Sequence, residues 1–555
     1  MQPSDEKRQT APASTDIQTV HPAHDAPAEP EQPRKTAPDA TAIILARGLE
    51  HLQRQDLFGA EAAFRVAIDL NPASAAAYNN LGVCLMRMNR LAEAATAFCQ
   101  TIRIQPDHAE AINNLAVVQL ESGQYPLAID NLRLALQCRP DYAEAWNNLG
   151  NAFARTDDPA MAAECYRHSL AIAPAQADPL TNLGTVLMEL GQHAEGEQAF
   201  RLAIRSAPDQ PAPLASALTW LDPEHNDADF SRLDDLYARR SGFQPTHQVL
   251  LGFAMGRVHD RAGRHAQAFA AWQEANRLHL QLHPFDESRE QRIFSQMQAT
   301  FNRDLIEQIA TERTVLPPSV QQRPPVFIVG MMRSGSTLLE QMLAAHPDIG
   351  VVGEVPWLQE AVEELQNAPP GGDASLLDLA GGNYLDKLWQ HHPAASRVVD
   401  KQLGNYLHLG LIHLLFPHAA ILHVHRNPVD CCFSCYTLRF SQGHEYAFDL
   451  ETMARQYNRY RQLMRHWESV LPAGRILDVS YETLVSQPET TLRDVLAHLS
   501  LPWHPACLHP EQVHRPVRTA SLIQVRKPVY RTAVGRWKPY AEWLKPLIDA
   551  LEETS

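Results

Sequence analysis

The sequence predicts an α-helical solenoid followed by an α/β domain with a parallel central sheet, and three observations lead to this fold class. Five prolines recur at one constant interval in the first half of the chain. In the second half, a short apolar segment typical of a buried parallel strand runs directly into a glycine loop, and a helical segment follows. The 555 residues suffice for roughly three to four domains of ordinary size.

The first half of the chain is a repeat array. Proline recurs at five equally spaced positions (Pro72, Pro106, Pro140, Pro174, Pro208). A small residue recurs with the same spacing at five others (Gly48, Gly82, Ala116, Gly150, Gly184). Small residues let two helices approach closely, and the proline ends the second helix of each pair. The constant interval equals the period of tetratricopeptide repeats, and it predicts five regular units over residues 39–208. A degenerate sixth unit is expected in a helical linker over residues 209–322, at Gly256, Gly263, Ala268 and Ala275.

Asparagine recurs on the first helix of four units, at Asn80, Asn114, Asn148 and Asn182. A row of carboxamides can hydrogen-bond the backbone of an extended peptide, since each offers a donor and an acceptor. The repeats would then form a groove for a peptide or protein acceptor. Alternatively, these asparagines are solvated or satisfy contacts between helices, and the sequence leaves both interpretations open.

The overall charge and the chain ends exclude several classes of protein. The net charge is −16; residues 1–322 hold 27 basic and 40 acidic residues, and residues 323–555 hold 21 and 24. This acidity is unlike a general nucleic-acid binder, which carries a basic face. The chain has neither an apolar run long enough for a membrane span nor a secretory signal, so we expect a cytoplasmic protein. Residues 1–38 are expected to be a disordered Pro-rich tail, and residues 546–555 a C-terminal tail.

The second half, expected to form one domain over residues 323–545, carries a phosphate-binding loop. Val326–Val329 is the predicted strand, the loop covers residues 330–337, and a helix is expected over 338–345. This order points backbone amides and a helix N-terminus at an anion. Arg333, Ser334, Gly335, Ser336 and Thr337 can hold a 5′-phosphate, although Ser336 stands where an ATPase has lysine.

Residues 325–339 resemble the 5′-phosphosulfate loop of sulfotransferases that use 3′-phosphoadenosine 5′-phosphosulfate (PAPS). They are most similar to the tyrosylprotein sulfotransferase branch and to bacterial proteins that join tetratricopeptide repeats to such a domain. The resemblance covers about residues 323–545. It implies a P-loop-like α/β sulfotransferase domain that transfers a sulfuryl group from PAPS to an acceptor hydroxyl, with a peptide or protein tyrosine as the first candidate. A carbohydrate or small-molecule hydroxyl stays open.

The resemblance also implies residues for the nucleotide. Arg426 follows the strand-like run 421–425, and Ser434, eight residues later, would complete the 3′-phosphate site with it. The alternative for Arg426 is an ion pair with Asp430. Tyr481 resembles a strand residue on the adenine side. Lys527 would bind the 3′-phosphate, with Arg526 or Arg536 as alternatives.

For the transfer itself, the resemblance implies a base and a cation. Sulfuryl transfer to a hydroxyl needs a proton acceptor near the nucleophile, and Glu354 matches the proposed base of the tyrosylprotein branch. His346 is the rival, because many cytosolic sulfotransferases use histidine. Lys401 and Ser521 would stabilise the bridging oxygen and the sulfuryl group. The alternative for Lys401 is a surface ion pair with Asp400.

No metal is expected. The eight cysteines are expected to be buried reduced thiols, and the pairs His391-His392 and His423-x-His425 lack a further ligand at usable spacing. Two other classes of function compete with the sulfotransferase. A P-loop kinase or NTPase is opposed by Ser336, and a non-catalytic tetratricopeptide scaffold with a degenerate nucleotide-binding domain is opposed by the retained site residues.

Overall fold

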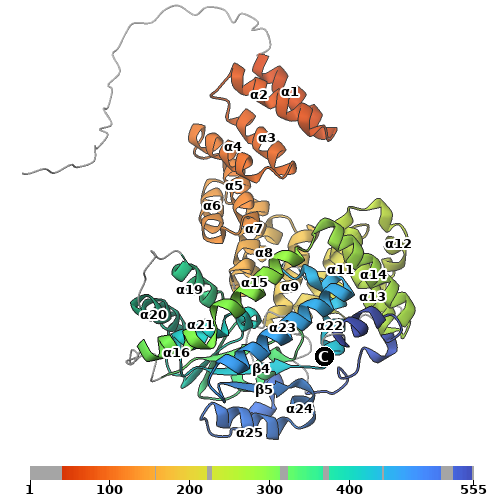
Figure 1. Ribbon diagram of the computed structural model, residues 1–555. Coiled ribbons are helices and arrows are strands. Elements are labelled where there is room, and N and C mark those ends of the chain that lie inside the picture. Colours follow the sequence, from red (N-terminus) through yellow and green to blue (C-terminus); the bar gives the residue numbers. More distant parts are fainter. Residues whose placement is uncertain are drawn as a thin grey trace, which may run out of the picture. The chain divides into compact units, whose positions relative to one another are not determined.

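The structure is a computed structural model that describes residues 40–156, 158–221, 228–312, 323–366, 374–440, 443–513 and 529–552 (Figure 1). It divides into two compact units, residues 1–106 and 107–555. The division falls inside the repeat array, whereas the sequence suggested boundaries at residues 208 and 322. Each unit is described by itself below.

Ten helices form the five predicted repeat pairs. The first unit contains α1 (Ala40–Gln53), α2 (Leu57–Leu70), α3 (Ala75–Arg87) and α4 (Leu91–Ile104). The second unit contains α5 (Ala109–Glu121), α6 (Tyr125–Cys138), α7 (Ala143–Arg155), α8 (Pro159–Ile172), α9 (Ala177–Leu190) and α10 (His193–Ser206). The predicted helical solenoid is confirmed.

The small-residue column faces an aromatic ring within each pair. The ring follows the glycine at the same sequence interval in the pairs Gly48–Phe64, Gly82–Phe98, Gly150–Tyr166 and Gly184–Phe200. A Cβ atom at these glycines would lie between 2.4 and 2.9 Å from a ring carbon. Because real Cβ atoms do not approach so closely, the ring fills the space that the glycine leaves, and this contact fixes the packing of the pair.

The linker contains the predicted degenerate pair. Its helices are α11 (Pro211–Trp220), α12 (Leu233–Ala238), α13 (Pro245–Arg261), α14 (His265–Leu282), α15 (Glu287–Thr300) and α16 (Arg303–Glu312). Gly256 of α13 faces Trp272 of α14 at that same sequence interval, and a Cβ there would lie 2.4 Å from the indole Nε1. The pair α13–α14 is therefore built like a regular repeat.

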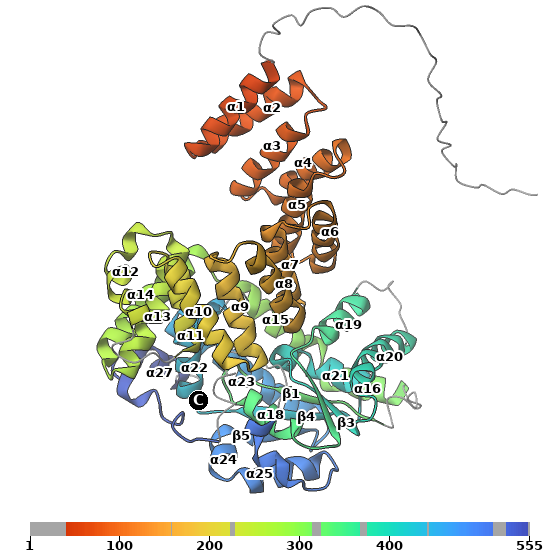
Figure 2. The same cartoon turned by 180° about the vertical axis from the view of Figure 1, so that it is seen from behind.

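The predicted parallel sheet is also confirmed. Its strands are β1 (Val326–Val329), β2 (Ile349–Gly353), β3 (Arg397–Asp400), β4 (Ala420–His425) and β5 (Ile476–Ser480). They are ordered β2-β3-β1-β4-β5, and every pairing is parallel. Figure 2 labels β1, β3, β4 and β5 of this sheet. All four residues of β1 are buried, as expected for a central strand with both faces covered.

Helices cover both faces of the sheet. They are α18 (Ser336–Ala344), α19 (Trp357–Gln366), α20 (Ala374–His391), α21 (Leu409–Leu415), α22 (Pro428–Tyr436), α23 (Leu450–Val470), α24 (Tyr481–Ser486), α25 (Pro488–His498) and α27 (Lys545–Glu552). Phe327 and Val329 enter one core with α20 to α23, whereas Val326 and Ile328 enter another with α18, α24 and α25. The alternation along β1 thus separates the two cores.

The pair α13–α14 shares the first of these cores with the sheet. Trp272 lies edge-on to Phe433 of α22, with ring centroids 6.0 Å apart. Asn276 donates a hydrogen bond to the carbonyl of Tyr436 at 3.1 Å. Asp260 of α13 forms an ion pair with Arg536 at 2.8 Å. The degenerate repeat therefore packs directly against the α/β domain and shares its core.

The C-terminal end differs from the expectation. A tail was expected from residue 546, but α27 covers Lys545–Glu552. Its Leu547 and Leu551 are buried in the same core, since the two apolar side chains lie four residues apart on one face of the helix.

None of the helices in the described ranges is long and apolar enough to cross a membrane.

Candidate active site

The predicted glycine loop directly follows β1, and a predicted site residue directly follows each of the other four strands. Gly330 follows β1, Glu354 follows β2, Lys401 follows β3, Arg426 follows β4 and Tyr481 follows β5. Because the strands are parallel, these positions meet at the carboxyl edge of the sheet, where α/β proteins bind their ligands. The strand order places Glu354 and Lys401 at what we term the β2–β3 end, and Arg426 and Tyr481 at the β4–β5 end. The glycine loop lies between them.

The glycine loop has a backbone that requires its two glycines. Gly330 and Gly335 have φ values of 153° and 104°. A Cβ at Gly330 would lie 2.3 Å from the carbonyl oxygen of Val424, and one at Gly335 would lie 2.4 Å from the Tyr481 ring. The loop ends at α18, whose N-terminal amides are available to an anion. The helix begins at Ser336, two residues earlier than expected.

Side chains of the loop are arranged as an anion site requires. The Ser334 hydroxyl is buried, and its Oγ has no hydrogen-bond partner among the described residues. The Nε of Arg333 donates to Oγ of Ser434 at 3.0 Å, which joins the loop to α22. An unsatisfied hydroxyl next to a guanidinium and helix amides suits a phosphate group. The structure thus brings Ser434 to the loop residue Arg333, although the two are far apart in the sequence.

Arg426 is buried at the β4–β5 end and bonded to main-chain oxygens. Its Nη1 donates to the carbonyl of Arg333 at 3.4 Å, and its Nη2 donates to the carbonyl of Ala533. Its Nε has no partner among the described residues. The guanidinium lies over the Tyr481 ring, 4.8 Å from the centroid. Tyr481 was expected on a strand, but it is the first residue of α24, since β5 ends at Ser480.

The alternative role of Arg426, an ion pair with Asp430, is present only as a longer contact. The Nη2 of Arg426 lies 3.8 Å from Oδ1 of Asp430. The Asp430 carboxylate instead accepts hydrogen bonds from the backbone amides of Gly535 at 2.6 Å and Trp537 at 3.3 Å. Asp430 therefore fastens the 535–537 segment onto α22, and the guanidinium keeps a free donor.

At the β2–β3 end, a buried ammonium group lies between two carboxylates. The Nζ of Lys401 donates to Oε1 of Glu354 and lies 3.7 Å from Oε2 of Glu340. The side chain of Lys401 is 1% exposed and that of Glu340 is 2% exposed, whereas that of Glu354 is 40% exposed. The backbone amide of Lys401 donates to the carbonyl of Gly353 at 2.9 Å, so the ends of β2 and β3 hold the two side chains together. Glu340 was not predicted.

The expected alternative for Lys401, an ion pair with Asp400, is not formed. Asp400 is fully buried and accepts hydrogen bonds from the Tyr384 hydroxyl at 2.8 Å, the Gln402 amide at 2.8 Å and the Asn405 side chain at 3.3 Å. Burial is the largest effect on its carboxyl group and raises the pKa from 3.8 to about 6, although the three hydrogen bonds oppose this rise. Asp400 therefore holds Gln402 and Asn405 in place in the segment that follows β3.

His346, the rival base, is occupied elsewhere. Its Nε2 is 2.9 Å from the carbonyl oxygen of Pro502, and its Nδ1 is 3.1 Å from the backbone amide of Asp348. A ring that donates to a carbonyl and accepts from an amide has both nitrogens satisfied. The side chain holds the turn before β2 and does not line the cavity described next.

A cavity of about 720 Å³ opens at the glycine loop and the β2–β3 end. Its walls include Arg333, Gly335, Ser336, Thr337 and Glu354 among the predicted residues. The walls also contain side chains that the sequence did not single out, namely Glu290, Gln359, Gln402, Asn405, Tyr406, His408, Phe440, His444, Tyr446 and Gln456. A signal for some of them existed, because residues 402–408 follow a buried strand and are rich in polar side chains.

Three predicted nucleotide or transfer residues, Ser521, Arg526 and Lys527, lie outside the described residues. Arg536, the other alternative for the 3′-phosphate, forms an ion pair with Asp260 and lies 5.7 Å from the centroid of the Phe433 ring.

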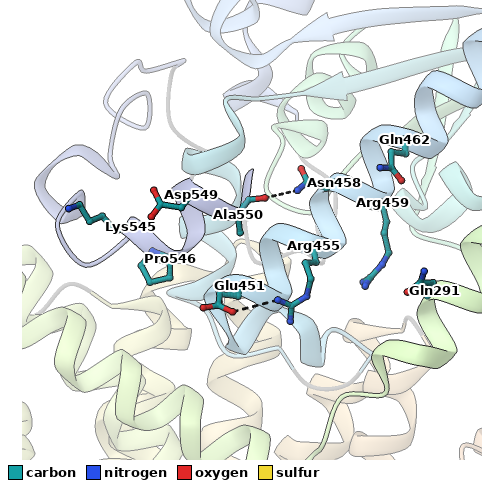
Figure 3. Close-up of a pocket in the computed structure, with 10 residues that line it drawn as sticks. All are labelled: Gln291, Glu451, Arg455, Asn458, Arg459, Gln462, Lys545, Pro546, Asp549 and Ala550. Atoms are coloured by element: carbon teal, nitrogen blue, oxygen red, sulfur yellow. Dashed lines mark hydrogen bonds and ion pairs between the residues drawn. The ribbon is translucent and has the colours of Figure 1, made fainter. Parts of the chain in front are cut away.

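A second cavity of about 680 Å³ lies between α15, α23 and α27 (Figure 3). It contains none of the predicted residues. Among its lining residues, Arg455 contacts Glu287 at 2.8 Å and Glu451 at 3.6 Å, and Asn458 donates to the carbonyl of Ala550 at 2.8 Å.

Two of the four recurring asparagines make contacts between helices of neighbouring repeats. Asn148 donates to the side chain of Asn113 at 3.0 Å. Asn182 donates to the side chains of Asn147 and Asn151 at 3.3 and 3.1 Å. For these two positions the structure supports the inter-helix interpretation, because their amide donors are used within the array.

The structure arranges no group of three or more His, Cys, Asp or Glu side chains for a metal ion in its described ranges. Cys431 and Cys435 donate to the carbonyl of Met332 at 3.1 and 3.5 Å and so support the glycine loop. The expectation of buried thiols holds for six cysteines but is wrong for Cys99 and Cys138, which are exposed on the repeat helices. His423 is buried, with Nδ1 2.6 Å from Asp478.

Comparisons with known proteins agree with the two-part architecture. Residues 324–505 match the sulfotransferase family. Residues 45–109, 107–175 and 148–211 match tetratricopeptide repeats. Among solved structures, the crystal structure of the MamA protein is similar with a TM-score of 0.28 and 21% identity, over 31% of this chain and 93% of that chain.

Three relatives illustrate the range of similarity. An uncharacterized protein of Aquifex aeolicus (strain VF5) is 32% identical over 54% of this chain and 41% of its own length. The Protein-tyrosine sulfotransferase of Drosophila melanogaster is 28% identical, over 39% of this chain and 47% of its own length. Protein-tyrosine sulfotransferase 1 of Danio rerio is 27% identical, over 45% of this chain and 74% of its own length. The chain spans less than half the length of the first two.

The family matches show that the chain joins tetratricopeptide repeats to a domain of the sulfotransferase family over residues 324–505.

Proposed function

We propose that the protein transfers a sulfuryl group from PAPS to an acceptor hydroxyl. The observation that carries this proposal is the order of groups along the carboxyl edge of the sheet. A carboxylate and a cation lie at one end, an anion-binding loop lies in the middle, and a second cationic site lies at the other end. A donor with two separate anionic ends needs two anion sites and a reaction site in this order.

The donor would lie from the glycine loop to the β4–β5 end. The loop amides with Ser336 and Thr337 would hold the 5′-phosphosulfate, and the unsatisfied Ser334 hydroxyl supports this assignment. Arg426 and Ser434 would hold the 3′-phosphate. Arg426 would exchange its bond to the Ala533 carbonyl for the phosphate, and its unpartnered Nε would donate a second bond. Tyr481 would contact the adenine, with Lys527 as a further ligand of the 3′-phosphate.

The transfer would take place at the β2–β3 end. The acceptor oxygen forms a bond to sulfur while the bond from sulfur to the bridging oxygen breaks. Glu354 takes the acceptor proton, and the electron pair of the broken bond leaves with adenosine 3′,5′-bisphosphate. Lys401 and Ser521 would stabilise the charge on the bridging oxygen, and Arg333 would stabilise the sulfuryl oxygens. Lys401 and Glu354 contact each other before the donor binds, so each changes its partner on binding.

A tyrosine of a peptide or protein is the acceptor that we favour. The cavity beside Glu354 is lined by Tyr406, Phe440 and Tyr446, which suits a phenol ring. Two of the relatives carry the name protein-tyrosine sulfotransferase. The repeats would recruit the polypeptide that carries this tyrosine. A carbohydrate hydroxyl is the alternative acceptor, because the same walls also carry polar side chains such as Gln359, Gln402 and Asn405.

The test uses the full chain, isotope-labelled PAPS and a library of peptides that each contain one tyrosine. We expect sulfated peptides by mass spectrometry, without added metal. Glu354→Gln should abolish most of the product, by roughly 100-fold or more. His346→Gln, at the rival position, should retain activity. If the protein sulfates sugars but no peptide, the acceptor is a carbohydrate hydroxyl and the tyrosine assignment is wrong. Absence of any transfer, with intact binding of adenosine 3′,5′-bisphosphate, would favour the scaffold.

A further inference from the structure

We infer that Glu340 is a positioning residue for Lys401: it is the carboxylate that remains with the ammonium group when Glu354 turns to the acceptor. This inference rests on the proposed function, and it concerns a residue outside the predicted site.

The position of Glu340 connects two parts of the site. It lies on α18, three residues after Thr337 and four after Ser336, so it is one helical turn below the residues that would hold the 5′-phosphosulfate. A Cβ at Gly353 would lie 3.9 Å from its Oε1, which places its carboxylate against the end of β2. Its Oε2 is 3.7 Å from Nζ of Lys401. One short helix thus carries both the anion-binding turn and a counter-charge for the cation.

Glu340 and Glu354 differ in what they can reach. The side chain of Glu354 is 40% exposed and lines the cavity, so it can meet an acceptor hydroxyl. The side chain of Glu340 is 2% exposed and is not among the residues that line the cavity. Of the two carboxylates that share Lys401, one can take a proton from the acceptor and the other stays where it is.

The transfer requires this division of roles. Lys401 is 1% exposed, and a buried ammonium group without a counter-charge is strongly destabilised. When Glu354 leaves it for the acceptor, a second carboxylate must keep the ammonium charged and in place. Asp400 is the next carboxylate along the chain, but its oxygens already accept from Tyr384, Gln402 and Asn405. Glu340 is the remaining acidic contact of Lys401 in the described part of the chain.

A double-mutant cycle tests the inference, with the most active tyrosine peptide of the library as the acceptor. We expect Glu340→Gln to lower kcat by roughly 10- to 100-fold, because the bridging oxygen loses a correctly placed cation. The Kd of adenosine 3′,5′-bisphosphate should rise far less than kcat falls, since the loop amides and the β4–β5 end would supply most contacts of this ligand. Glu340→Asp, which keeps the charge, should recover part of kcat. Glu489→Gln, in an exposed pair with Arg493 on α25, is the matched control and should be silent.

The coupling to Lys401 separates positioning from a purely structural role. In a Lys401→Met background, adding Glu340→Gln should change kcat by less than about threefold. Independent, multiplying losses would overturn the inference, as would an equal weakening of bisphosphate binding or a full kcat in Glu340→Gln. If the wild-type protein transfers no sulfuryl group, the proposed function itself fails. If it is active and Glu340→Gln equals it, only the positioning role fails.

Discussion

The two ends of the sheet edge hold positive charge in different ways. At the β2–β3 end, Lys401 lies between Glu340 and Glu354, and a carboxylate with a raised pKa is its neighbour in the sequence. At the β4–β5 end, Arg426 is bonded to two main-chain carbonyls and stacks on Tyr481, and its contact with the Asp430 carboxylate is longer, at 3.8 Å. A set of groups that can exchange protons suits bond making, whereas a permanently charged guanidinium with a spare donor suits anion binding.

The largest effect should come from a substitution in the glycine loop, because this loop lies between the β2–β3 and β4–β5 ends and its distortion disrupts both sites. Gly335→Ala places a methyl group 2.4 Å from the Tyr481 ring, at a φ of 104° that alanine rarely adopts. We expect a loss of roughly a thousandfold in kcat/KM, together with lost bisphosphate binding. Gly382→Ala, on α20 in open space, is the control and should leave both unchanged. Retained binding in Gly335→Ala, measured by calorimetry, would show that the loop does not hold the donor.

Lys401→Met should break the β2–β3 end alone. Loss of the cation should lower kcat by about 100- to 1000-fold, while the Kd of adenosine 3′,5′-bisphosphate rises far less, because most contacts of this ligand would lie at the loop and the β4–β5 end. Steady-state kinetics and calorimetry measure the two quantities. Lys387→Met, in an exposed ion pair with Glu360, is a matched control. A weakened Kd with an unchanged kcat would assign Lys401 to nucleotide binding and erase the difference between the two ends.

Arg426→Ala should break the β4–β5 end and give the opposite result. Loss of two charge-assisted hydrogen bonds should cost about 3 kcal/mol, or roughly 100-fold in the Kd of the bisphosphate. The kcat at saturating donor should fall far less, since the reacting atoms lie at the other end. Arg493→Ala on α25 controls for removal of an exposed arginine. A fall in kcat at saturating donor without a change in Kd would contradict the assignment.

The smallest effect concerns pH and the β2–β3 end. The pKa of Asp400 is about 6 in the folded protein and 3.8 in the unfolded chain, so the folded protein binds the proton more tightly. Protonation of Asp400 therefore stabilises the folded protein most below pH 4, and this stabilisation is lost as the pH rises through 6. The loss between pH 4 and pH 7 is about 2 kcal/mol in the free energy of unfolding. Asp400→Asn should remove this part of the pH dependence in denaturant titrations. An unchanged slope in the variant would show that other groups produce it.

The sequence was sufficient for features that depend on spacing. The constant period of the repeats predicts the helix pairs, including the unit with Gly256, and the burial of residues 326–329 follows from four apolar residues before a glycine loop. Residues directly after a strand, such as Glu354 and Arg426, could be assigned because the resemblance to a family supplied their order. In parallel sheets, such residues meet at one edge whatever the lengths of the connections.

Features that depend on packing between distant segments could not be predicted. Glu340 stands beside Gln341 in α18 and would be taken for a surface residue from the sequence, until α18 is placed against β2 and β3. The hydrogen bond from Tyr384 to Asp400 depends on how α20 packs on the sheet. His346 was a fair rival from its position alone, and the structure separates it because its ring bonds to Pro502, 156 residues away.

The contacts of the pair α13–α14 determine where the chain can be truncated without exposing the core of the α/β domain. Trp272 fills the space at Gly256, as aromatic rings do in the regular repeats, but it also rests on Phe433 of the helix that carries Ser434. A fragment that starts at the strand β1 would leave that face of α22 exposed to water, and it would lack the acidic partner of Arg536. The smallest fragment that folds with an intact sheet domain should therefore begin before Pro245. An exchange of repeat arrays between related proteins should keep the last helix pair with the recipient.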